Sequence, residues 1–391
     1  MTSRHTFAAL FAVTFLTLIS IGATLPVLPQ YVKGPIGSTD LAVGVVTGAY
    51  AVTGLLFRPL AGSFADARGR RPVVVVGAAL TVIATLLYFA PLGVAGLIVA
   101  RLILGAGEGV VYTAGSAWVV DITDPARRGR IIGFYGLAIW GGLSVGPAIG
   151  ELLLRAGSYE AVWAFAAAAP MIAVVIASRI PEPPRPARSP SSERRSRLFS
   201  REAVGPGLAM TMATLGYAAL AGFIVLHLDD RGIGHGAAVF SAFAVTVVSS
   251  RLLFGWLPDR YGPVRCAVGA GIIEAAGLVA LALTQSLGVA ILGAVAIGAA
   301  FSLMFPSLVL LVVNRVEADR RGVAMGTFTA CFDLGVGLGA PIAGVAAALG
   351  GYGAAFALAG VAALGASVLA FMLGRRILAA VAAEEPAPLP A

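Results

Sequence analysis

The sequence predicts an all-α membrane protein with twelve transmembrane helices in two pseudo-symmetric halves of six helices each. Of the 391 residues, 59% are hydrophobic and only 12% are charged, and the mean hydropathy is +0.93. A soluble protein of this size has too little interior to bury so much apolar surface. The hydrophobic residues fall in runs long enough to cross about 30 Å of hydrocarbon at 1.5 Å per residue. One residue pattern also occurs twice along the chain.

Each apolar run is expected to be a helix, because a segment inside lipid must satisfy its own backbone hydrogen bonds. In chain order, the expected spans are residues 7–32, 42–61, 72–92, 94–120, 131–154, 160–180, 204–228, 237–257, 264–284, 288–313, 323–349 and 353–373.

The arginines indicate how the spans are oriented. They concentrate in alternate loops and near both termini, whereas the loops on the other side contain Lys33, Arg155 and Arg231. Positively charged loops stay in the cytoplasm, so both termini are predicted to be cytoplasmic. Lys33 is the only lysine, a bias consistent with a GC-rich bacterial genome, which makes the inner membrane the expected location.

The repeat has a fixed offset of 193 residues. Arg58, Gly62, Asp66 and Gly69 have identical counterparts in Arg251, Gly255, Asp259 and Gly262. The same offset relates glycines of the fifth and eleventh spans, which indicates a duplicated six-span unit. The predicted units are residues 1–180 and 204–383. A Pro-, Ser- and Arg-rich cytoplasmic linker, 181–203, joins them, and a disordered tail, 384–391, follows.

Four motifs resemble those of the major facilitator superfamily, and the resemblance covers essentially the whole chain. The loop Gly62…Asp66…Gly69-Arg70-Arg71 resembles the signature between the second and third helices of that family, and Gly255…Asp259-Arg260-Tyr261-Gly262 resembles its weaker copy. Arg101 to Gly107 resembles the arginine motif of the fourth helix. Gly133…Gly142…Gly146-Pro147…Gly150 resembles the fifth-helix motif of the drug:proton antiporters, although Glu151 stands where that motif ends in glycine.

The signature loop is a candidate gate. Gly62 would let two helix ends approach closely between the halves, and Asp66 could cap or face a helix N-terminus. Arg70 could reach Asp121 at the end of the fourth span, a contact that would lock the outward-facing state. Alternatively, these arginines only set topology. The predicted gating set is Gly62, Asp66, Gly69, Arg70, Asp121, Gly255, Asp259 and Gly262.

The glycines of the fifth and eleventh spans predict a close-packed, bendable seam between the halves. Gly142 and Gly146 are four residues apart, a spacing that brings helices together, and Pro147 can kink the helix. The resemblance to antiporters implies that this seam limits proton leak. The predicted seam residues are Gly133, Gly142, Gly146, Pro147, Gly150, Gly335 and Gly339.

Ionisable residues inside spans are costly in hydrocarbon and are therefore candidates for function. Glu108 lies near the middle of the fourth span and Asp333 near the middle of the eleventh. Arg101 precedes Glu108 by two helical turns, which places both on one face, and the family fold implies that this face lines the cavity. We expect these three residues to couple transport to protons, or alternatively to form a structural ion pair. Glu274 in the ninth span is expected to be peripheral or interhelical.

Aromatic residues in the spans could form an apolar binding cavity, although single aromatics in helices commonly serve packing. Tyr112 follows Glu108 by one helical turn and shares its face. The candidate cavity residues are Tyr31, Tyr112, Tyr217, Phe223, Phe301 and Phe305.

The function expected from these features is secondary active transport by alternating access: proton-coupled efflux of small amphipathic compounds, as in multidrug antiport. The alternative is proton-coupled uptake of a sugar, amino acid or organic anion. No phosphate-binding Gly-x-x-x-x-Gly-Lys-Ser/Thr loop occurs, so the proton gradient is the expected energy source, without a cofactor. No His/Cys/Asp cluster suits catalysis or a metal, so neither an enzyme nor a metal site is expected. Expected partners are a small-molecule substrate, protons and the lipid bilayer, with no nucleic acid and a monomeric state.

Overall fold

The computed structural model describes residues 3–124, 128–182, 200–317 and 321–384, and within these ranges every regular element is a helix. Twelve of the described helical segments are long and apolar enough to cross a membrane, which confirms the predicted fold class. The N-terminal half comprises α1 (Ser3–Thr24), α2 (Val27–Lys33), α3 (Asp40–Arg68), α4 (Arg70–Leu86), the 3₁₀ turn η1 (Leu87–Phe89), α5 (Gly93–Asp121), α6 (Arg128–Ala156) and α7 (Tyr159–Arg179).

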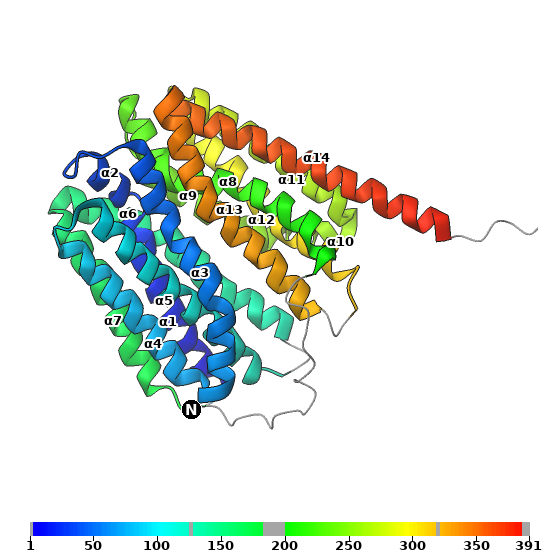
Figure 1. Cartoon of the computed structure of the whole chain (residues 1–391), viewed down its shortest axis with the longest axis horizontal. Coiled ribbons are helices and arrows are strands. Elements are labelled where there is room, and N and C mark those ends of the chain that lie inside the picture. Colours follow the sequence, from blue (N-terminus) through cyan, green and yellow to red (C-terminus); the bar gives the residue numbers. More distant parts are fainter. Residues whose placement is uncertain (1–2, 125–127, 183–199, 318–320, 385–391) are drawn as a thin grey trace, which may run out of the picture.

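The C-terminal half comprises α8 (Arg201–Asp230), α9 (Gly236–Phe254), α10 (Leu257–Tyr261), α11 (Pro263–Leu283), α12 (Leu287–Val313), α13 (Arg321–Gly350) and α14 (Tyr352–Glu384). The two halves lie side by side, with the first at the lower left and the second at the upper right (Figure 1). Two features differ from the predicted spans. The first span is divided into α1 and α2 next to Pro26, and the short helix α10, with Pro258 in its first turn, lies in the second signature loop.

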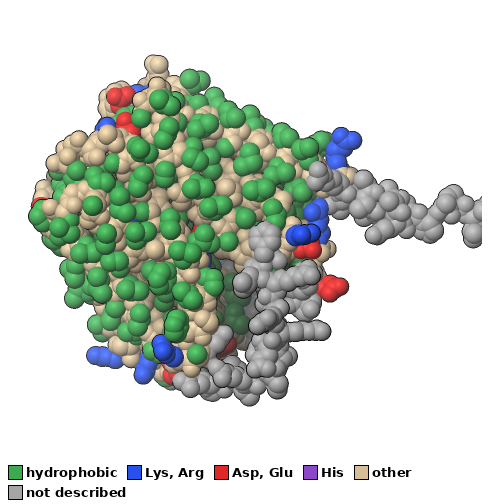
Figure 2. Space-filling model, viewed as in Figure 1, with side chains coloured by type: hydrophobic (Ala, Val, Ile, Leu, Met, Phe, Trp, Pro, Cys, Tyr) green, Lys and Arg blue, Asp and Glu red, His purple; other side chains and the backbone are tan. Residues whose placement is uncertain are grey.

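The outer surface is that of a protein dissolved in lipid. Hydrophobic side chains cover most of the face shown in Figure 2, and charged side chains gather at its margins. Leucines that would be buried in a soluble protein project outward, as at Leu349, which is 86% exposed, and Leu283, which is 71% exposed. The chain is therefore a multi-pass membrane protein.

The repeat seen in the sequence is present in the packing. In the first half, the backbone of Gly105 in α5 lies against the carbonyl of Tyr50 in α3, so closely that a Cβ would overlap it. In the second half, 193 residues on, Gly298 of α12 lies against the carbonyl of Phe243 in α9. The same backbone contact thus fixes the same helix pair in each half.

The halves meet along two helix pairs, α3 with α13 and α6 with α9. We call the end of the molecule where α3 begins the Asp40 end and the opposite end the Arg68 end. Gly44 packs against the backbone of Ala340 and Pro341, and Gly48 packs against that of Gly337. Beyond them, the hydroxyl of Tyr352 donates to Oδ1 of Asp40 at 3.2 Å. These contacts close the interface at the Asp40 end.

Candidate functional site

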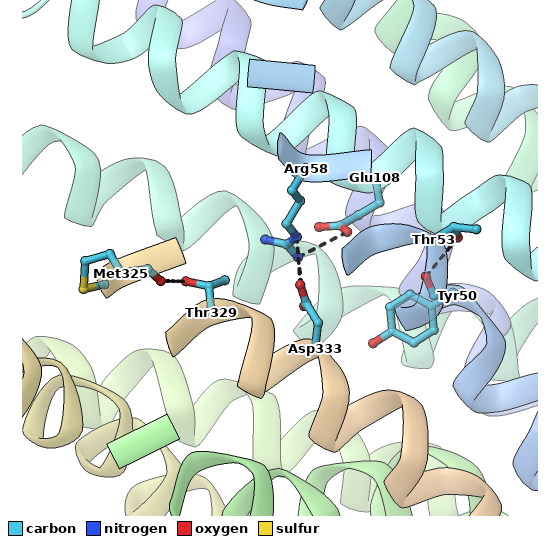
Figure 3. Close-up of polar contacts among 7 residues, drawn as sticks. All are labelled: Tyr50, Thr53, Arg58, Glu108, Met325, Thr329 and Asp333. Carbon is cyan, nitrogen blue, oxygen red and sulfur yellow. Dashed lines mark hydrogen bonds and ion pairs between the residues drawn. The ribbon is translucent and has the colours of Figure 1, made fainter. Parts of the chain in front are cut away.

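Three charged side chains from both halves meet near the middle of the molecule (Figure 3). Arg58 of α3 lies with its Nε 3.1 Å from Oδ2 of Asp333 in α13, and its Nη2 donates to Oδ1 at 3.3 Å. The same Nη2 is 3.7 Å from Oε2 of Glu108 in α5. Glu108 is 8% exposed and Asp333 5% exposed, so both carboxylates depend on Arg58 for compensation of their charge. We call these three residues the charge cluster.

The charge cluster brings together two predicted residues, Glu108 and Asp333, and one that sequence reasoning missed. The missed residue is Arg58, which the sequence shows as part of the repeat. An arginine inside an apolar run is itself a signal that a buried acid is nearby. Because Arg58 and Asp333 belong to different halves, their ion pair connects the two bodies of the molecule.

Arg101, the third predicted proton-coupling residue, lies apart from the charge cluster. Its side chain is fully buried, donates to the carbonyls of Val46 (3.1 Å) and Thr47 (2.9 Å), and sits 4.6 Å above the ring of Tyr50. Arg101 therefore binds α5 to the first turns of α3. The spacing predicts that Arg101 and Glu108 share one face of α5. In the structure their side chains nevertheless contact different partners.

The repeat produces a second arginine site with different neighbours. Arg251 corresponds to Arg58, and it lies 5.9 Å from the ring of Phe305 just as Arg58 lies 5.8 Å from the ring of Tyr112. The positions that correspond to Glu108 and Asp333 hold Phe301 and Trp140. Nε of Arg251 has no hydrogen-bond partner in the described part of the chain, and none of the described carboxylates forms an ion pair with it. One copy of the site is thus acidic and the other aromatic.

An aromatic cluster at the junction of α6, α8, α9 and α12 contains two of the predicted cavity residues. The ring of Trp140 lies 5.6 Å from that of Phe301, 6.3 Å from that of Tyr217 and 6.2 Å from that of Phe243. Tyr112 and Phe305 lie beside Arg58 and Arg251 respectively, and Phe305 also packs on Phe328, 5.4 Å away.

Two of the predicted cavity residues, Tyr31 and Phe223, lie away from this aromatic cluster. Tyr31 in α2 contacts the rings of Tyr159 (4.9 Å) and Trp163 (5.6 Å) within the first half. Phe223 is fully buried in α8 against Tyr352 at 6.2 Å. Both positions are near the Asp40 end, where the aromatic rings fill the closed interior.

The signature loop forms one of its predicted contacts. Nε of Arg70 binds Oδ2 of Asp121 at 2.8 Å, as expected. Both residues belong to the first half, so the contact joins α4 to α5 and does not lock the two halves together. The prediction of a close approach at Gly62 was wrong for this conformation, because a Cβ there would meet nothing within 4 Å. Gly69 has φ = 103°, a conformation that favours glycine. The side chain of Asp66 lies outside the described part of the structure.

Glu182, which falls within the predicted linker, caps the N-terminus of α4 at the signature loop. The carboxylate of Glu182 accepts from the backbone N–H groups of Arg70 and, at 2.9 Å, of Arg71. An anion at this position satisfies free donors at the N-terminus of α4 and interacts favourably with the helix dipole. In the second copy of the loop, Asp259 is exposed, Gly262 has φ = 90° and Gly255 lies between α9 and α10.

The glycine seam packs within each half rather than between halves, so that prediction was wrong. Gly142, Gly146 and Gly150 of α6, with the buried Pro147 in the same helix, face α1, where their neighbours are Leu18 to Ala23. Gly335 and Gly339 of α13 face α8 in the same way. The side-chain surroundings of Gly133 are outside the described structure. The residues of α13 that do face the other half are offset from these glycines: Gly337, Ala340, Pro341 and Gly344.

One further carboxylate is buried away from the charge cluster. Glu274 in α11 is fully buried beside Gly216 of α8, and neither of its oxygens has a hydrogen-bond partner among the described residues. The expectation of a peripheral position was wrong, whereas an interhelical position is confirmed.

This arrangement, two six-helix bundles with a shared charge cluster between them, defines the class of twelve-helix membrane transporters. The family model described as Major Facilitator Superfamily matches residues 10–238 and 207–390. The chain therefore belongs to the Major Facilitator Superfamily.

Curated relatives in bacteria share this family. An uncharacterized MFS-type transporter of Salmonella typhimurium is 32% identical over 389 residues, covering 95% of this chain and 98% of its own. The uncharacterized MFS-type transporter YhhS of Escherichia coli is 29% identical, covering 85% of this chain and 83% of its own.

Solved structures share the fold at low identity. A bacterial homolog of the human lysosomal transporter Spinster, in an inward-facing and unoccupied conformation, has a TM-score of 0.78 at 16% identity and covers 96% of this chain and 98% of its own. The nucleoside transporter NupG has a TM-score of 0.75 at 16% identity, covering 95% and 99% respectively. The human organic anion transporter MFSD10 has a TM-score of 0.71 at 19% identity, covering 95% and 100%.

Proposed function

We propose that this superfamily member is a proton-coupled transporter of the inner membrane that exports small amphipathic compounds by alternating access. The charge cluster is the observation that carries the proposal. With both carboxylates ionised, Arg58, Glu108 and Asp333 have a net charge of −1, and a single proton makes them neutral. A neutral cluster is the cheaper state in a medium of low dielectric constant, so proton binding favours a conformation in which the cluster is buried.

The position of the charge cluster links the proton to the movement of the halves. Asp333 belongs to the second half and its partners Arg58 and Glu108 to the first. Protonation of Asp333 weakens the attraction across the interface, whereas its ionisation strengthens it. A proton can therefore change the relative stability of two arrangements of the halves, which is what coupling requires.

The packing supports an inward-facing state. The backbone contacts between halves lie toward the Asp40 end, and the arginine-rich Arg68 end is the one predicted to face the cytoplasm. The similarity to an inward-facing Spinster homolog agrees with this assignment. The substrate region in this proposal is the aromatic cluster around Trp140, next to the charge cluster. The transporter would act as a monomer, with the proton gradient as its only energy source.

Export rests on the resemblance of the α6 glycines to those of the drug:proton antiporters. A cationic substrate would compete with the proton for Glu108 and Asp333, and such competition produces exchange. A second candidate, uptake of an organic anion together with a proton, is favoured by Arg251. Its partly buried guanidinium, which has no carboxylate partner among the described residues, suits an anionic group, and a bound anion near the charge cluster would favour protonation.

The proposal is tested by proton movement in proteoliposomes that contain a pH-sensitive dye. Ethidium serves as the cationic probe and 2-naphthoate as the anionic probe. We expect protons to cross the membrane in the direction opposite to ethidium, and we expect this movement to be lost in Glu108→Gln and in Asp333→Asn. Glu160→Gln, a change at an exposed carboxylate, is the control.

The outcomes separate the candidates. Movement of protons in the same direction as naphthoate would replace export by anion uptake. Proton movement that persists at the wild-type rate in both carboxylate variants would refute the role of the charge cluster.

A further inference from the structure

We propose that a cavity at the Arg68 end of the second half binds the phosphate headgroup of an anionic phospholipid. The cavity has a volume of about 800 Å³ and lies among the start of α11, the end of α12 and the last transmembrane turns of α14. Three arginines line it: Arg265 in the first turn of α11, Arg315 just after the end of α12, and Arg375 in α14. We call it the three-arginine cavity. The site is separate from the charge cluster and does not depend on the proposed function.

The positive charge of the three-arginine cavity is not neutralised by the described protein. No carboxylate lines it, and none of its arginines forms an ion pair with another described residue. Nη2 of Arg315 donates to the carbonyl of Leu373 at 3.3 Å, which holds the guanidinium against α14. Partial desolvation of its guanidinium lowers the pKa of Arg315 although the residue is exposed. A bound anion would supply the missing compensation.

Comparison of the two halves shows that this charge is specific to the second. In the first half, Asp121 at the end of α5 binds Arg70 at 2.8 Å. The corresponding position 193 residues later, at the end of α12, is Asn314, which also lines the three-arginine cavity. An amide replaces the acid, and the counterpart of Arg70 is Pro263. The arginines of the second half at this end occupy other positions, and no carboxylate lines the cavity beside them.

The walls of the cavity match a lipid better than a free ion. Val264, Val268, Leu311 and Phe371 line it beside the arginines. Phe371 is 52% exposed and Met372, its neighbour in α14, is 51% exposed, so the cavity adjoins the apolar outer surface of a membrane helix. An anionic phospholipid presents this combination, because its phosphate can bind guanidinium groups in a bidentate manner while its chains follow an apolar surface.

The lipid would hold three helices of the second half together at the end where the halves must separate and approach during transport. Because the arginines belong to α11, to α14 and to the segment that directly follows α12, a single headgroup can restrain all three helices. The inference concerns binding and stability and makes no assumption about the transported substrate.

The test is a lipid titration of the purified full-length protein in dodecylmaltoside, followed by thermal unfolding and by native mass spectrometry. The probes are dioctanoyl-phosphatidylglycerol, dioctanoyl-phosphatidylcholine and inorganic phosphate. We expect phosphatidylglycerol to bind more tightly than phosphatidylcholine. Arg265→Gln, Arg315→Gln and Arg375→Gln should each weaken it about fivefold, the value expected for one basic residue near an anionic lipid. Arg315→Lys should retain most of the binding because it keeps the charge.

Arg179→Gln is the matched control, since Arg179 is an exposed arginine near the end of α7 in the first half. A loss in this control as large as in the cavity variants would show nonspecific attraction and overturn the proposal. Equal binding of the two lipids would overturn it as well, as would unchanged affinity in all three cavity variants. Tight binding of inorganic phosphate, with no gain from the acyl chains, would replace the lipid by a free anion. All four arginines are exposed, so these variants are expected to fold.

Discussion

Arg58 has to compensate two carboxylates that approach it from different halves of the molecule. Removing the guanidinium would leave Glu108 and Asp333 buried close together with no cation. This change is far less favourable than replacing all three charged side chains by neutral ones. Its counterpart Arg251 has no ion-pair partner among the described carboxylates, so its removal leaves none of them uncompensated. The two arginines are equivalent by the repeat, but we expect the same substitution to change the free energy of unfolding differently at each of them.

We expect Arg58→Met to lower the free energy of unfolding by about 3 kcal/mol. Adding Asp333→Asn to this variant should restore part of the loss, because it removes one of the uncompensated charges. Arg251→Met is the matched control and should be neutral or stabilising. Thermal unfolding in detergent measures all three variants. If Arg251→Met lowered the free energy of unfolding as much as Arg58→Met does, the contribution of Arg58 to stability would not come from compensating Glu108 and Asp333.

At the scale of the helix, small residues determine how closely neighbours approach. Gly105 and Gly298 lie against carbonyl groups of α3 and α9, which cannot move aside as a side chain could. Gly136 in α6 has nothing within 4 Å of a Cβ built on it. These three glycines look alike in the sequence, and only packing distinguishes them.

Gly105→Ala and Gly298→Ala are each expected to destabilise the protein by about 1–3 kcal/mol through overpacking of the helix pair. Gly136→Ala should be neutral or slightly stabilising, because alanine is the better helix former. The measurement is the midpoint of thermal unfolding of purified protein, with the yield from membranes as a second readout. Equal midpoints for the three variants would contradict the packing described for α3–α5 and α9–α12.

The contrast between predicted and observed helix contacts has a physical basis. Hydropathy predicts the spans well because lipid leaves a segment no alternative to helix. It says little about which helix a given face meets. The face of α6 that contains Gly142 and Gly146 was expected to contact the other half and instead meets α1, because the rotation of a helix depends on all of its neighbours together.

At the scale of the whole molecule, alternating access requires the Asp40 end to open. Asp40 and Tyr352, which are hydrogen-bonded at 3.2 Å across the two halves, offer a reversible restraint. In a background with Cys266 and Cys331 replaced by alanine, Asp40→Cys with Tyr352→Cys should be joined by a short bis-methanethiosulfonate reagent. We expect cross-linking to stop transport and a thiol reductant to restore it, as measured by substrate flux in proteoliposomes.

The single Asp40→Cys variant treated in the same way is the control and should keep its flux. Undiminished flux in fully cross-linked protein would mean that the Asp40 end does not open during transport.

The sequence predicts much of the whole molecule but only part of the site. The 193-residue offset predicts two equivalent bodies, and the Arg70–Asp121 contact follows from charge and position alone. The meeting of Arg58 with Asp333 could not be derived, because they are 275 residues apart and their contact depends on how the halves dock. The difference between the two arginine sites could not be derived from the sequence either. It appears only when Phe301 and Trp140 near Arg251 are compared with Glu108 and Asp333, which occupy the equivalent positions near Arg58.

The contact of α3 with α13 through Gly44, Gly48, Gly337 and Ala340 has a kinetic consequence. Interlocked side chains must leave their rotamer wells before two helices can turn against each other, whereas nearly bare backbones have little to disengage. The activation barrier for rocking the halves is then expected to arise from a few polar links, Arg58–Asp333 and Asp40–Tyr352 among them. Turnover would be governed by breaking and making those links, and hence by the protons and ligands that compete for them.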